Sequence, residues 1–122
     1  MPHYPAEFEI PDDWLSEAGI IGFKPTATAY RSTAAAVLIP LTAIEPVARF
    51  VAYPKDWRGF DRARLIRLLK GFVAGDEIEP VPAVELPTHE FASSPYRYRV
   101  RDGFHRFHAS IVAGFDMLPV DL

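Results

Sequence analysis

The chain has 122 residues, of which 49% are hydrophobic, so its length and composition suit a single domain built around one core. Its 13 basic and 16 acidic side chains give a formal net charge of −3, which argues against a protein that coats nucleic acid. The sequence has no cysteine, no signal-peptide pattern and no membrane-length apolar run, which excludes a disulfide scaffold or a catalytic thiol and favours a cytoplasmic protein.

Residues 1–35 are predicted to form an N-terminal arm. Asp12 or Asp13 can cap a short helix that Gly19 closes. Residues 23–35 show no clear period, which indicates an extended segment that wraps the core. We expect the aromatic side chains of the arm to cover the core or a partner subunit rather than to bind a ligand; they are Phe8, Trp14, Phe23 and Tyr30.

The middle of the chain predicts a strand, a helix and a second strand. The first strand is residues 37–40, and the helix runs over residues 62–74 with Asp61 as its N-cap and Gly75 as its stop. Residues 81–86 form the second strand, whose proline indicates an edge position or a strand start. The buried stripe of the helix is predicted to be Leu65, Leu68, Leu69, Phe72 and Val73.

The last third of the chain predicts a strand, a sharp turn, a helix and a final strand. Aromatic or apolar residues alternate with arginines over residues 96–101, the period of a half-buried strand. Gly103 breaks that pattern, residues 104–112 have helical spacing, Gly114 ends the helix, and residues 117–120 form the final strand. A helix that begins just after a glycine turn directs backbone N–H groups outward, so we expect an anion site there.

A family resemblance follows from these motifs. The segment Asp102-Gly-Phe-His-Arg-Phe-His-Ala, followed by Ala-Gly-Phe and Leu-Pro-Val, resembles the G-x-x-R-x-x-A box of the ParB N-terminal domain and sulfiredoxin superfamily. Val37-Leu-Ile-Pro-Leu-Thr-Ala-Ile-Glu-Pro resembles the opening strand of this family, and residues 65–84 resemble its middle helix and next strand. The resemblance covers residues 36–122. It implies a single compact α+β domain, with a small mixed sheet, packed helices and residues 1–35 as an extension.

This fold hosts nucleotide clamps, nucleases, a sulfinic-acid reductase and small-molecule kinases, so the family leaves the activity open. Phe104 stands where sulfiredoxin has its cysteine, which excludes the reductase. The kinases of the superfamily carry a similar D-G-H-H-R box, but they use a glutamate where this chain has Val47 and Ala48. The sequence ends two residues past the final strand, so we expect no DNA-reading module of the partition-protein kind.

The leading expectation is a nucleotide or other phosphorylated small ligand, such as ATP or CTP with Mg²⁺, bound at the turn. Arg106 offers a planar fork suited to phosphate oxygens, and we expect it to serve the ligand rather than the fold. His105 and Asp102 are the candidate acid–base residues, although phosphoryl transfer and hydrolysis both stay open. No metal site is predicted from protein side chains. The candidate ligand-binding residues are Gly103, Phe104, His105, Arg106 and His108, with Arg49 implied by the resemblance and Arg67 chosen from the middle helix.

Structural interpretations of the same residues stay open. Gly103 could only permit a positive φ, Arg106 could pair with Asp102, and His105 could be a hydrogen-bonded structural imidazole. The alternative functions are a non-catalytic interaction or regulatory module and, ranked lower, a ParB-like nuclease. A second copy of the chain or a protein partner is expected to bind through the arm, whereas nucleic acid and membranes are not expected partners.

Overall fold

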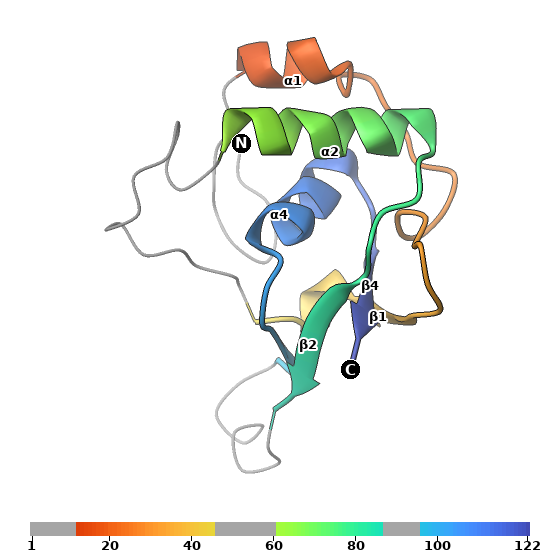
Figure 1. Cartoon of the computed structure of the whole chain (residues 1–122), viewed down its shortest axis with the longest axis vertical. Coiled ribbons are helices and arrows are strands. Elements are labelled where there is room, and N and C mark those ends of the chain that lie inside the picture. Colours follow the sequence, from red (N-terminus) through yellow and green to blue (C-terminus); the bar gives the residue numbers. More distant parts are fainter. Residues whose placement is uncertain (1–11, 46–60, 87–95) are drawn as a thin grey trace.

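The computed structural model describes residues 12–45, 61–86 and 96–122. These residues form an α+β domain, as the sequence predicted, and none of their helices is long and apolar enough to cross a membrane (Figure 1). The elements in chain order are α1 (Asp12–Ala18), β1 (Val37–Pro40), the 3-10 helix η1 (Leu41–Ala43), α2 (Arg62–Ala74), β2 (Val81–Glu85), β3 (Tyr98–Val100), α4 (Phe104–Ala113) and β4 (Met117–Asp121).

The four strands form one mixed sheet in the order β1-β4-β2-β3. The β1–β4 and β2–β3 pairs are antiparallel, and the β2–β4 pair is parallel. After β1 the chain crosses to the opposite edge of the sheet, where Ile44 bridges Tyr98 of β3. Two backbone bonds hold this crossing, from the Glu45 N–H to the Tyr98 carbonyl at 2.9 Å and from the Arg97 N–H to the Ala43 carbonyl at 2.8 Å. The segment after β1 therefore covers the β3 edge.

Strand β2 lies inside the sheet, so the edge position predicted from its proline is wrong. Pro82 is the second residue of the strand and faces Asp121 at the end of the parallel ladder. Its carbonyl still accepts the Arg101 N–H at 2.9 Å. The strand-start interpretation holds, because a proline without an N–H is tolerated where a ladder begins.

The helices pack in layers over one side of the sheet, with α4 nearest the strands, α2 above it and α1 outermost (Figure 1). Helix α2 has the predicted bounds, with the Asp61 carboxylate accepting the Arg64 N–H at 3.0 Å and Gly75 in the left-handed conformation. Its predicted stripe is corrected at two residues, since Val73 is exposed and Ile66 is buried. Helix α1 packs on one side of α2, and helix α4 packs on the other. The buried surface of α2 is therefore wider than a single stripe.

Several described residues of the arm belong to the core. Trp14, Ile20 and Tyr30 are buried, and the Tyr30 ring stacks on Phe72 with centroids 5.4 Å apart. Burial raises the pKa of Tyr30 to about 12, so its hydroxyl stays protonated and donates to the Glu79 carbonyl at 2.7 Å. The prediction that the arm covers the core holds for these residues, whereas Phe8 lies outside the described residues.

Candidate functional site: a basic cleft at the start of α4

A cleft of about 380 Å³ lies between α2 and the first turn of α4. This volume falls near the lower end of small-molecule sites, which span about 300–1,000 Å³. Three segments far apart in the sequence supply its walls, and the tertiary fold brings them together. The lining residues are Arg64, Arg67 and Leu68 of α2, Ile78 and Glu79 before β2, and Asp102, Gly103, Phe104, His105 and Arg106 at the start of α4.

Most of the predicted site residues line this one cleft. His108 does not line it, and Arg49 lies outside the described residues. Arg64 and Glu79 also line the cleft, although the sequence did not predict them as site residues. The spacing predicts Arg64 once Arg67 is predicted, because residues three apart on a helix share a face.

Gly103 is the N-cap of α4, with φ 153°, and close packing requires a glycine there. A Cβ on this residue would lie 2.6 Å from the Cγ1 atom of Val81, well inside van der Waals contact. The space left by the missing side chain is therefore occupied by β2. A phosphate therefore cannot enter on the side where a Cβ would lie, but Gly103 lines the cleft and its φ is positive, so the expected anion contact at this residue stays a prediction.

Arg106 is bound to the backbone of the protein. Its Nη1 atom donates to the carbonyls of Glu79 at 3.2 Å and Pro80 at 2.9 Å, and its Nη2 atom donates to the carbonyl of Asp102 at 3.2 Å. Arg106 therefore binds the backbone carbonyl of Asp102, whereas the sequence suggested an ion pair with the Asp102 carboxylate. The expectation that Arg106 serves only the ligand is wrong, because it joins the start of β2 to the start of α4. Its positive charge nevertheless contributes to the cleft wall.

His105 is buried, with 4% of its surface exposed, and connects two helices. Its Nε2 atom accepts the backbone N–H of Asp61, the N-cap of α2, at 2.8 Å. Because a backbone N–H can only donate, Nε2 must be unprotonated and the neutral ring carries its proton on Nδ1. The Nε2 lone pair is therefore already engaged, which supports the structural interpretation of His105 and argues against Nε2 as a general base.

His108 is also buried, and it is not among the residues that line the cleft. Its Nδ1 atom lies 2.8 Å from the Phe104 carbonyl, and its ring is tilted against the Phe104 ring with centroids 4.5 Å apart. Burial lowers the pKa of His108 to about 4, against the opposing effect of the carbonyl bond. The lowered pKa favours the neutral ring, and His108 does not line the cleft, so its predicted role as a ligand contact has no support from the cleft lining.

The cleft carries more positive than negative charge. Three guanidinium groups line it, those of Arg64, Arg67 and Arg106, against the two carboxylates of Glu79 and Asp102. The N-terminal end of α4 adds the positive end of a helix dipole. Across residues 12–45, 61–86 and 96–122, no group of three or more His, Asp or Glu side chains is placed to hold a metal ion. The arrangement suits an anion more than a metal.

Comparisons of the chain with protein-family models, with curated proteins and with solved structures gave no match. The ParB/sulfiredoxin-like assignment therefore stays a prediction that rests on the motif residues.

Proposed function

We propose that this protein binds a phosphorylated small molecule in the cleft between α2 and α4, with a nucleotide as the leading candidate. One observation carries the proposal: Arg64 and Arg67 of α2 line the same cleft as Arg106 at the start of α4. Guanidinium groups bind phosphate oxygens through paired hydrogen bonds, and a helix N-terminus favours the same charge.

The contacts favour binding over catalysis. The Nε2 atom of His105 already accepts a backbone N–H, which leaves Asp102 and Glu79 as the cleft groups able to accept a proton. The same two carboxylates could contribute to Mg²⁺ binding if the phosphate supplied further oxygens, because Mg²⁺ in nucleotide sites is held by one or two carboxylates and the phosphates.

The test is a thermal-shift and calorimetric titration with ATP, CTP, AMP and inorganic phosphate, with and without Mg²⁺. A ligand that binds only the folded state raises the melting temperature by mass action. Arg64→Gln and Arg67→Gln should each weaken binding about tenfold, equivalent to about 1.4 kcal/mol. Both side chains are exposed, so folding should be unchanged.

Lys70→Gln is the matched control, because Lys70 is an exposed cation on the same helix that does not line the cleft. Arg106→Ala is a poor probe, since it would also release three backbone carbonyls. The proposal fails if none of the four compounds shifts the melting curve at millimolar concentration, or if Lys70→Gln weakens binding as much as Arg67→Gln.

A non-catalytic interaction module is the second candidate, and one observation favours it. Gly103, His105 and Arg106 each make a contact that supports the fold, so the box has a structural use without any ligand. A failure of all four titrations would favour this candidate.

A further inference from the structure

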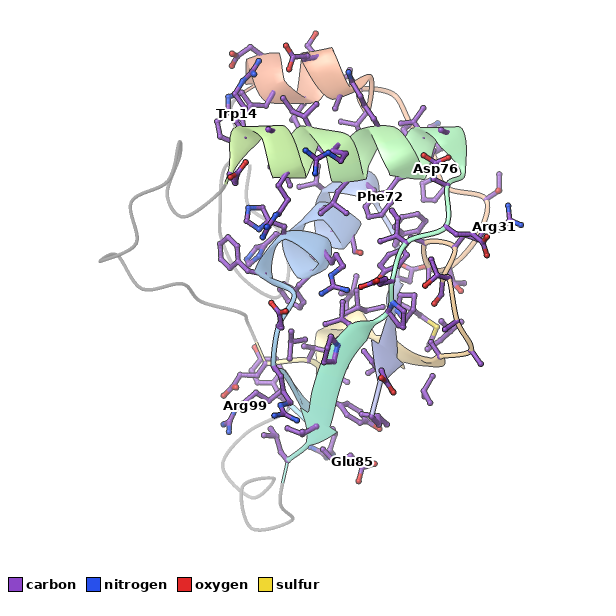
Figure 2. All side chains as sticks on the ribbon, in the orientation of Figure 1. Trp14, Arg31, Phe72, Asp76, Glu85 and Arg99 are labelled. Atoms are coloured by element: carbon purple, nitrogen blue, oxygen red, sulfur yellow. The ribbon has the colours of Figure 1, made fainter. Side chains whose placement is uncertain are left out.

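A second groove, of about 530 Å³, lies at the other end of α2 and shares no lining residue with the basic cleft. The arm forms one wall, and the last turn of α2 together with Phe115 forms the other. In Figure 2, Phe72 and Arg31 lie toward the end of α2 that Asp76 marks. The side chains that matter to its chemistry are Phe23, Lys24, Tyr30, Arg31, Phe72 and Phe115.

The base of the groove is a fixed aromatic cluster. Tyr30 and Phe72 are stacked, with 15° between their ring planes, and Phe115 meets Phe72 edge-on at a centroid distance of 5.3 Å. Phe23 meets Phe115 edge-on at 6.4 Å. The hydrogen bond from the Tyr30 hydroxyl to the Glu79 carbonyl holds the first ring in place. The Tyr30, Phe72 and Phe115 side chains are only 4%, 5% and 9% exposed, so their packing fixes the wall of the groove, and the half-buried Phe23 is its most accessible ring.

The charge at the groove has one sign. Lys24 and Arg31 are exposed and line it, and no carboxylate is among its lining residues in the described part of the chain. This is informative because the whole chain is acidic, with a net charge of −3.

The C-terminal end of α2 carries the partial negative charge of the helix dipole, which offsets part of the positive charge of Lys24 and Arg31. The carbonyls of Gly71 and Phe72 accept N–H groups from Asp76 and Gly75, which satisfies two of the terminal acceptors of the helix. The Asp76 and Glu77 carboxylates follow the helix but do not line the groove.

We propose that this groove binds a small planar aromatic anion, such as an aromatic carboxylate. The ligand ring lies against Phe23 and the apolar wall of the groove, and its negative charge faces Lys24 and Arg31. A volume of about 530 Å³ is in the range of small-molecule sites. Charge complementarity selects an anion over a neutral aromatic compound, and this site is independent of the phosphate-binding function proposed for the cleft.

The experiment compares 2-naphthoate with its neutral isostere 2-naphthamide by NMR-monitored titration of the full chain. Naphthoate should bind at least about tenfold more tightly than naphthamide. The Lys24→Gln/Arg31→Gln double variant should remove this difference. Ala27→Trp, at an exposed position lining the groove, should block both compounds.

Arg64→Gln/Arg67→Gln is the matched control, since it removes two cations from the other cleft and should leave naphthoate affinity unchanged. Equal affinities of the unmodified protein for naphthoate and naphthamide would by themselves overturn the proposal. Absence of naphthoate binding at millimolar concentration would also overturn it. A third outcome would also overturn the proposal. If a short acidic peptide containing phenylalanine binds more than tenfold more tightly than naphthoate, the occupant of the groove is a peptide.

Discussion

Helix α4 carries three polar side chains that are almost completely buried, and their hydrogen-bond partners differ. His105 accepts the Asp61 N–H, and His108 bonds to the Phe104 carbonyl. The Ser110 hydroxyl is fully buried and has no hydrogen-bond partner in the part of the chain that the structure describes. A buried polar group costs free energy unless it is bonded, so these three residues should respond differently to substitution.

Ser110→Ala should stabilise the protein by about 1 kcal/mol, because it removes an unsatisfied buried hydroxyl and introduces a better helix former. Urea denaturation should show a higher midpoint at an unchanged slope. Ser32→Ala is the control, since the Ser32 hydroxyl donates to the Ala34 carbonyl at 2.7 Å and its removal should bring no gain. A loss of stability in Ser110→Ala would show that the hydroxyl has a partner, such as an ordered water.

His108 should make the stability depend on pH. Its pKa is lowered in the folded state from 6.5 to about 4, so between these values the unfolded chain binds a proton that the folded protein does not. The stabilisation is therefore fully present above pH 6.5, declines as the pH falls, and is lost as the pH passes the folded pKa. The total contribution is up to about 3 kcal/mol, at about 1.4 kcal/mol per pKa unit.

The measurement is the free energy of unfolding of the protein and of His108→Gln across that pH interval. The glutamine amide can still donate to the Phe104 carbonyl but does not titrate. Carboxylates titrate in both proteins, so the difference between the two curves isolates His108. Parallel curves would contradict the lowered pKa.

At the scale of elements, the start of α4 is the point where α2, β2 and α4 are joined. Arg106 binds the carbonyls that precede β2, His105 binds the N-cap of α2, and Gly103 packs on Val81 of β2. None of these contacts belongs to a regular helix or strand ladder. The relative placement of the elements, and with it the cleft, depends on them.

Gly103→Ala should destabilise the fold by about 2–4 kcal/mol, through overpacking against Val81 and a strained backbone. Adding Val81→Ala should recover part of this loss, and a double-mutant cycle measures the recovery. Gly75→Ala is the control, because φ there is 76° but no atom lies within 4 Å of the added Cβ, so only the strain of about 1–2 kcal/mol applies. Additive effects of the two substitutions at Gly103 and Val81 would contradict the contact.

At the scale of the whole molecule, several arginines of the described residues are engaged in ion pairs or line the basic cleft. Arg62 pairs with Glu17 at 2.8 Å and Arg99 pairs with Glu45 at 2.7 Å, while Arg64, Arg67 and Arg106 line the basic cleft. Duplex DNA binding needs several cations along a groove and weakens steeply with salt. A net charge of −3 adds to the repulsion.

Duplex DNA should therefore bind only weakly at about 0.15 M salt, the physiological ionic strength, and Mg²⁺ should not elicit cleavage. Fluorescence anisotropy with a labelled duplex and a plasmid-nicking assay provide the measurement. Sub-micromolar affinity, or nicking that His105→Ala abolishes while the variant stays folded, would favour the nuclease alternative over the small-ligand proposal.

The amino-acid sequence by itself determined where the main helices and strands lie. Helix α2 follows from the Asp61 cap and the Gly75 stop, and the end of α4 follows from Gly114. These signals are local, because a cap or a helical period depends on residues within a few positions. The α+β class and the position of the turn before α4 were predictable for the same reason.

Only the tertiary structure decided what the residues at that turn do. The Nε2 atom of His105 bonds to a residue 44 positions away, and Arg106 bonds to carbonyls 26 and 27 positions away. The sequence shows that both side chains can form hydrogen bonds. Whether their partner is a ligand or the main chain depends on the tertiary structure. That choice depends on how α4 packs against α2 and β2, since packing sets which backbone groups are buried and must be satisfied.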